Sequence, residues 1–93
     1  MPSLDTVSAE LLTPIRNNAV IRLPGRRFPA IAIQGDSLSV LVELGKSVCQ
    51  RAGQFGDQIL SDEANALREL LETIQQQYEQ ALSAHGIDLP YRR

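Results

Sequence analysis

The spacing of apolar and polar residues changes near residue 35, from the two-residue period of strands to the longer period of helices. Before that point, short apolar stretches alternate with polar residues, and the alternation predicts three strands. Turn sequences at Asn17-Asn18 and Pro24-Gly25 separate them, since Asn and Gly tolerate the backbone angles that tight turns need. The simplest arrangement is an antiparallel meander, with strands expected over about 6–12, 19–23 and 29–34.

The third of these strands consists of small and β-branched residues, from Ala30 to Ile33. A nearly continuous apolar stretch is typical of a strand buried on both faces. This pattern favours a central position in the sheet, although the connection lengths leave the strand order open.

A first helix is expected over about 37–55, with Asp36 or Ser37 as its N-cap. Its apolar stripe is interrupted by Gly45, and glycine costs a helix interior about 1 kcal/mol relative to alanine. The residue therefore indicates that another backbone approaches the helix closely at this point.

A second helix is expected over about 61–85, with Ser61 or Asp62 as the N-cap and Gly86 just beyond its end. Its apolar residues follow steps of four and three, a spacing that lets two long helices pack nearly antiparallel. They are Leu60, Ala64, Leu67, Leu71, Ile74, Tyr78, Ala81 and His85.

The order of elements indicates a single α+β domain over residues 1–93. It consists of a three-stranded antiparallel meander followed by a two-helix hairpin packed on one sheet face. The extended tail, 86–93, is expected to fold back onto the body and to leave Arg92 and Arg93 in water.

Composition changes this picture in one respect. The chain has 93 residues, 43% apolar, but few aromatic residues and no Trp, so its core must consist mainly of aliphatic side chains. Such a small core supplies only a few kcal/mol of net stability. We therefore expect a homodimer, which would bury further apolar surface.

The single cysteine, Cys49, excludes an intrachain disulfide and fits a reducing compartment. The first residues, MPSLDTVSAELL, lack the basic and apolar regions of a signal peptide. No apolar run approaches the roughly 18 residues of a membrane span. A cytoplasmic location without membrane association is expected.

The sequence contains no recognisable set of catalytic residues. His85, the only histidine, has no metal-ligand partner at suitable spacing and stands where a helix ends. Cys49 lies on an apolar helix stripe, and Gly35-Asp36-Ser37 lacks the second glycine of a nucleophile elbow. We expect a protein that is not an enzyme and that uses no metal or cofactor.

Two surfaces are candidates for binding a partner. Charge is uneven, because residues 1–35 carry four arginines against two acids, whereas residues 36–93 carry nine acids against five bases. The basic candidate is a turn with an adjacent aromatic ring, and the acidic one is the polar face of the second helix. Their residues are Arg22, Arg26, Arg27 and Phe28, and Glu69, Glu72 and Glu79, respectively.

The basic turn could contact phosphates and stack a base. The isoelectric point of about 5.2 argues against nucleic acid as the main partner, since nucleic-acid-binding domains are usually basic. Another protein is the favoured partner, with a ligand or nucleic acid as the alternative.

The segment RLPGRRFPAIAIQGDSL, together with the ending GIDLPYRR, resembles a family of small bacterial proteins of unknown function. The resemblance covers most of the chain and implies no activity or site residues. Bacterial immunity proteins, which occlude the active site of a toxin, are similar in size and general character. By that association, the most concrete expectation is an immunity- or antitoxin-type inhibitor that binds a toxin.

Overall fold

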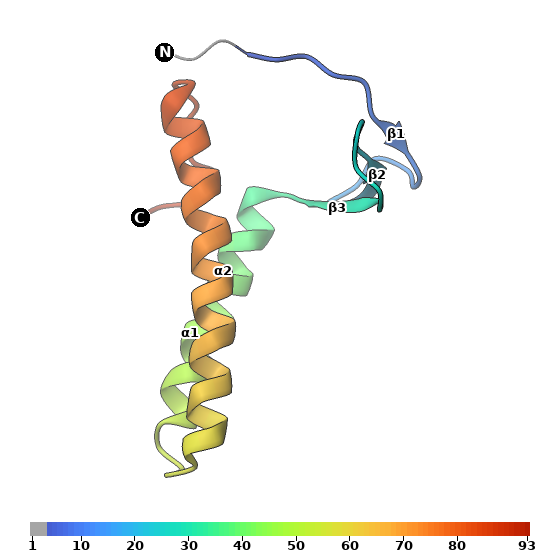
Figure 1. Cartoon of the computed structure of the whole chain (residues 1–93). Coiled ribbons are helices and arrows are strands. Elements are labelled where there is room, and N and C mark those ends of the chain that lie inside the picture. Colours follow the sequence, from blue (N-terminus) through green and yellow to red (C-terminus); the bar gives the residue numbers. More distant parts are fainter. Residues whose placement is uncertain (1–3) are drawn as a thin grey trace.

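The computed structural model describes residues 4–93, which form a small sheet and a long helical hairpin (Figure 1). The α+β class and the order of strands before helices are confirmed. The elements are β1 (Glu10–Leu11), β2 (Asn18–Arg22), β3 (Ala30–Ile33), α1 (Gly35–Ala52) and α2 (Gln58–Ala84).

The sheet is an antiparallel meander of order β1-β2-β3. Its middle strand is β2, so the prediction that the third strand is central was wrong. β3 is an edge strand, and the side chains of Ile31 and Ile33 are 63% and 43% exposed. β1 is shorter than the expected 6–12, since only Glu10 and Leu11 pair with β2.

The first helix begins two residues earlier than expected. Gln34 is its N-cap and makes no side-chain capping bond, whereas Asp36 lies in the first turn and accepts a hydrogen bond from the Ser37 N–H at 2.9 Å. Neither Asp36 nor Ser37 is therefore the N-cap. One residue alone separates β3 from α1, so the chain leaves the sheet along the direction of the strand.

The second helix also begins earlier, and its cap is Asp57, whose side chain accepts from the Leu60 N–H at 3.1 Å. The predicted caps, Ser61 and Asp62, lie inside α2. At the other end Gly86 has a φ of 68°, and the Ile87 N–H donates to the Leu82 carbonyl at 2.9 Å. This is the αL termination expected for a glycine just beyond a helix.

The two helices pack against each other along a narrow line. Val42 is only 1% exposed, and Gln75, which the sequence analysis did not place in the interface, is 4% exposed. A Cβ on Gly45 would lie 3.8 Å from the Arg68 Cα and 3.0 Å from a Leu71 methyl carbon. The close approach predicted from this glycine is thus confirmed.

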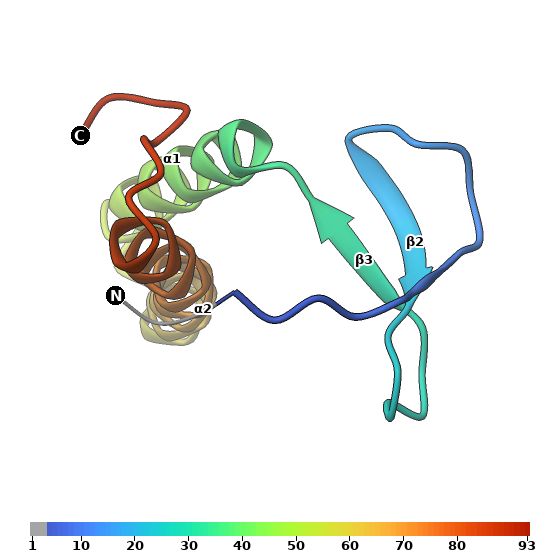
Figure 2. The same cartoon turned by 90° about the horizontal axis from the view of Figure 1, so that it is seen from above.

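The sheet stands beside the hairpin rather than underneath it (Figure 2). Among the described residues the extensive contacts between elements are those of α1 with α2 and of the strands with one another. The expectation that the hairpin covers one sheet face therefore differs from the structure. The one-residue connection between β3 and α1 explains the difference, because it is too short for the helix to turn back over the sheet.

This arrangement makes the molecule long, with extents of 49 × 29 × 22 Å and a radius of gyration of 16.3 Å. A compact domain of this length has a radius of gyration of about 12 Å. Much apolar surface therefore remains outside the core.

Candidate docking surfaces

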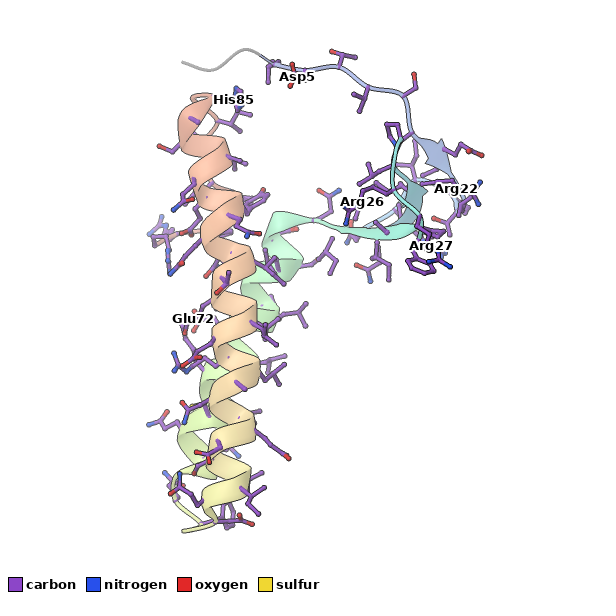
Figure 3. All side chains as sticks on the ribbon, viewed as in Figure 1. Asp5, Arg22, Arg26, Arg27, Glu72 and His85 are labelled. Atoms are coloured by element: carbon purple, nitrogen blue, oxygen red, sulfur yellow. The ribbon has the colours of Figure 1, made fainter. Side chains whose placement is uncertain are left out.

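The basic candidate is the turn between β2 and β3, here called the arginine turn and defined as residues 24–28. Gly25 adopts a φ of 76°, a left-handed conformation that favours glycine, and the Arg26 N–H donates to the Leu23 carbonyl at 3.3 Å. The local sequence thus favours this turn conformation. It lies at the end of β3 opposite to the end that leads into α1, and Figure 3 shows Arg26 and Arg27 on the sheet, away from the helices.

Within this turn the Arg27 guanidinium lies over the Phe28 ring, 5.1 Å from its centroid. The ring itself is 71% exposed. In residues 4–93 neither Arg26 nor Arg27 forms an ion pair. The turn therefore presents two positive charges and an aromatic face that the rest of the described chain does not neutralise or cover.

Arg22 behaves differently from the other two arginines. It lies opposite Glu10 in the β1–β2 pairing, and its guanidinium donates to the Glu10 carboxylate at 3.3 Å. Such an exposed cross-strand pair contributes little stability, but it satisfies the charge locally. The sequence pattern grouped Arg22 with Arg26, Arg27 and Phe28 in one basic surface. Its pairing with Glu10 distinguishes Arg22 from the other residues of that group.

The acidic candidate face of α2 is largely paired within the chain. Arg68 donates to Glu72 at 3.0 Å and lies 3.8 Å from the Glu69 carboxylate. The hydrogen bond to Glu72 is the main cause that raises the pKa of Arg68 above its ordinary value. Figure 3 shows Glu72 on the side of the hairpin away from the sheet.

Glu79 is held by the C-terminal tail. The Tyr91 hydroxyl donates to its carboxylate at 2.9 Å, and the Arg93 guanidinium binds both of its oxygens at 2.9 and 3.1 Å. Burial, followed by the hydrogen bond to Glu79, raises the pKa of Tyr91. The tail therefore folds back as expected, and Arg93 forms an ion pair with Glu79 while its side chain remains 51% exposed.

The reactive side chains do not meet. Cys49, on α1, donates to the side-chain oxygen of Asn65 on α2 at 3.0 Å. His85 is the C-cap of α2 and lies about 30 Å beyond Asn65 along that helix, at 1.5 Å per residue. No group of three potential metal ligands occurs in the part of the chain that the structure describes.

A third surface was missed by the sequence analysis. Several large apolar residues of the helices are 40–66% exposed, and two of them, Leu67 and Ile74, belong to the apolar spacing predicted for the second helix. Together with two residues of β3 they form what we call the open apolar face. Its residues are Ile31, Ile33, Val40, Leu41, Leu44, Val48, Leu67, Leu70 and Ile74.

Helix geometry places the two helical parts of this face on the same side of the hairpin. In α1 the exposed residues 41, 44 and 48 each precede a residue that faces α2. In α2 the exposed residues 67, 70 and 74 likewise precede residues that face α1. Each exposed residue therefore lies one position before a residue of the helix interface, which is a rotation of about 100° around the helix axis. Because the two helices are antiparallel, this rotation places both sets of exposed residues on the same side of the hairpin.

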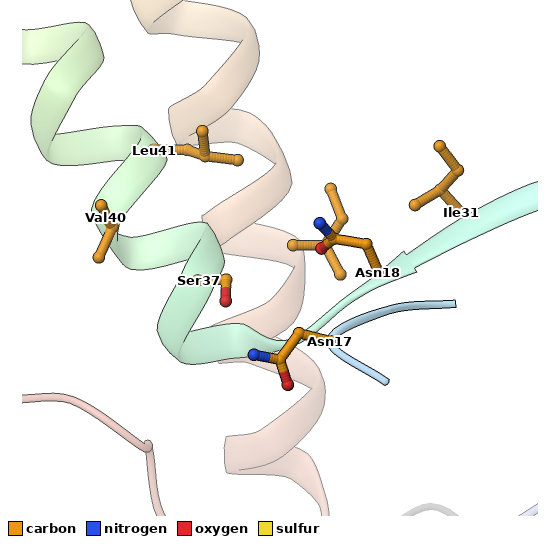
Figure 4. A pocket seen from close by; sticks show the side chains of 7 residues that line it. Asn17, Asn18, Ile31, Ser37, Val40 and Leu41 are labelled. Atoms are coloured by element: carbon orange, nitrogen blue, oxygen red, sulfur yellow. The ribbon is translucent and has the colours of Figure 1, made fainter. Parts of the chain in front are cut away.

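The face continues from α1 onto the sheet across a hollow of about 470 Å³. Ile31 and Ile33 border it on one side and Val40 and Leu41 on the other, as the close-up in Figure 4 shows for the labelled residues. Val20 pairs with Ile31 across the strands and so shares its sheet face. The corner between sheet and hairpin is thus lined mainly by apolar side chains.

The fold is that of a small α+β protein, and its arginine turn, acidic helix face and open apolar face are candidate docking surfaces. The chain belongs to a family of unknown function, DUF6959, whose family model matches residues 4–91. Neither a curated protein nor a solved structure matches it. Along the described residues no helix is long and apolar enough to cross a bilayer.

Proposed function

We propose that this chain is a non-enzymatic bacterial module for binding another protein, and that it acts in the cytoplasm as an immunity- or antitoxin-type inhibitor. An inhibitor of this kind blocks its target by occupying the active site, so it needs no catalytic group of its own. The observation that carries the proposal is the arginine turn, where an exposed aromatic ring lies beside two guanidinium groups that form no ion pair within residues 4–93.

Arginine and aromatic residues are enriched among the residues that dominate binding energy at protein interfaces. The stacking of Arg27 on Phe28 reduces the side-chain freedom that binding would otherwise remove. Because Arg26 and Arg27 have no ion-pair partner in residues 4–93, their charges attract an acidic patch on the target.

The acidic face of α2 supplies a second contact, with a basic cleft such as those that bind nucleic acids or nucleotides. Glu69 is its most available residue, because its side chain is 71% exposed and its contact with Arg68 is long, at 3.8 Å. Glu72 and Glu79 are more firmly engaged inside the chain and contribute mainly by holding Arg68 and the tail in place.

The stacked Arg27–Phe28 pair also favours a second candidate function, the binding of single-stranded nucleic acid. A ring that is exposed beside positive charges can stack a base while the guanidinium groups contact phosphates. The overall acidity of the chain makes this the less favoured candidate.

The test combines co-expression with binding. If the inhibitor function is right, the gene next to this one encodes a toxin, and co-expression of the two genes restores growth. Purified chain binds that toxin, and Arg26→Ala/Arg27→Ala weakens binding at least about tenfold, because two charged contacts are lost. The double variant Arg16→Ala/Arg92→Ala removes the same charge elsewhere and serves as the matched control.

Absence of growth rescue, or equal toxin binding by all three proteins, would contradict this proposal. Fluorescence anisotropy with a labelled single-stranded oligonucleotide tests the second candidate. Salt-dependent binding that only the Arg26→Ala/Arg27→Ala variant loses would favour nucleic acid as the partner.

A further inference from the structure

We propose that two copies of this chain associate through their open apolar faces, so that the two helical hairpins form a four-helix bundle about a two-fold axis. The open apolar face is separate from the arginine turn, on which the inhibitor function rests.

A single copy of the chain leaves an unusually large surface exposed. The chain has an accessible surface of 7428 Å², whereas a compact monomer of its mass exposes about 5,300 Å². The excess of about 2,000 Å² per copy is comparable to what each partner of an extensive obligate dimer buries. The open apolar face is part of this excess, and a second copy would bury it.

The open apolar face carries large aliphatic side chains near the middle of both helices. Leu44 and Leu70 are 58% and 66% exposed, although both lie at the centre of their helices. The charged residues of the same stretches pair with one another on other parts of the surface, as Lys46 does with Glu43 and Arg68 with Glu72. A two-fold interface brings like surfaces together, and an uncharged apolar face is the kind that can meet its own copy without repulsion.

The shape of the hairpin also fits a two-fold bundle. A helical hairpin with apolar stripes on one side is half of a four-helix bundle, in which each helix contacts two neighbours. The hollow between β3 and α1 is lined in part by Val40 and Leu41 of the open apolar face, and apolar side chains of the second copy can enter it. Ile31 and Ile33, exposed in a single copy, would then be covered.

The arginine turn stays accessible in this dimer. It lies at the far end of β3 from α1, so a bundle formed by the helices leaves it at the periphery. The dimer would therefore present two arginine turns, one on each copy, to its partners.

The test is the mass of the full chain in solution. Light scattering at tens of micromolar should give twice the chain mass of 10.2 kDa for the wild type. Leu44→Glu and Leu70→Glu should each raise the dimer dissociation constant about a hundredfold or more, because a buried carboxylate would have no partner. Phe28→Glu places the same charge on an exposed apolar residue outside the face, and this control should remain dimeric.

A second measurement, on the wild type, tests the dimer even if the variants do not fold as monomers. The thermal midpoint of a wild-type dimer rises with protein concentration, whereas that of a monomer does not. A wild-type chain that is monomeric at hundreds of micromolar, with a concentration-independent midpoint, overturns the proposal. A dimer that both variants leave intact also overturns it, since a different face would then be used.

Failure of the dimer and failure of the inhibitor function are distinguishable. Phe28→Glu should abolish toxin binding while the mass stays that of a dimer. Leu70→Glu should give a monomer that still carries an intact arginine turn.

Discussion

The phenol ring of Tyr78, on α2, occupies the position that a Cβ atom on Gly35 would take at the start of α1. The ideal Cβ would lie 2.6 Å from the Tyr78 Cε1 atom and closer still to the end of the ring. Gly35 is buried, and its φ is not in the left-handed region. The glycine is therefore required by close approach of the second helix, and not by an unusual backbone conformation.

Gly35→Ala should lower the free energy of unfolding by about 1–3 kcal/mol, because the ring or the start of α1 must move. Urea denaturation at fixed protein concentration measures the effect, and Tyr78→Leu in the same chain should recover part of it. Gly53→Ala is the matched control, since a Cβ there would meet only ordinary contacts beyond 3.4 Å. Equal stability of the wild type and Gly35→Ala would refute this account.

Asp57→Ala should destabilise the chain by about 1 kcal/mol, because the side chain that caps α2 would be lost. Asp62→Ala, at one of the positions expected from the sequence, should cost less, since Asp62 bonds only the exposed Gln58 side chain. Chemical denaturation of both variants measures the difference. A larger loss for Asp62→Ala than for Asp57→Ala would show that α2 begins later than described.

Tyr91 should titrate above its ordinary pKa of about 10, because burial and the bond to Glu79 both favour the neutral phenol. Since the folded-state pKa is raised, the contribution of Tyr91 to tail docking is complete below pH 10 and is lost as the pH rises through the raised value. Tyrosinate absorbance in a Tyr78→Phe background, where Tyr91 is the sole tyrosine, measures the midpoint. Glu79→Gln should lower that midpoint, and an unshifted midpoint in the parent would contradict the docked tail.

Val42→Ala should cost about 1.5–3 kcal/mol at any protein concentration, because Val42 is 1% exposed between the two helices. Val40→Ala makes the same truncation on the open apolar face, where the residue is 59% exposed in a single copy. Its effect should appear in the dissociation constant of the dimer and vanish under conditions where the chain is monomeric. Thermal unfolding of both variants across a range of concentrations separates the two outcomes.

Local features of the fold were predictable because short-range chemistry decides them. Gly86 ends α2 through a left-handed φ that glycine adopts without strain, and Pro24-Gly25 turns the chain between β2 and β3. Gly45 signalled the close approach of α2, since a glycine inside a helix is otherwise unfavourable. The helix caps were less predictable. Three residues near the start of α2 have side chains that can cap a helix, namely Asp57, Ser61 and Asp62. The packing of the first turn determines which of them is used.

The candidate surfaces also divide into features that local sequence predicts and features that depend on the tertiary structure. The basic turn with its aromatic ring could be found from residue types alone, and the structure leaves Arg26, Arg27 and Phe28 exposed there. The pairing of Arg22 with Glu10 and of Glu79 with Tyr91 and Arg93 joins residues that are 12 or more positions apart. Sequence spacing within one element does not determine such contacts.

The sequence by itself therefore determined the α+β class, the order of elements and the existence of an antiparallel helical hairpin. These properties follow from the period of apolar residues and from turn chemistry, which act over a few residues. Only the tertiary structure decided which apolar residues are buried. Gln34 alone joins β3 to α1, so the sheet stands beside the hairpin, and apolar residues that the pattern assigned to the helix seam, such as Leu67 and Ile74, remain half exposed on one open face.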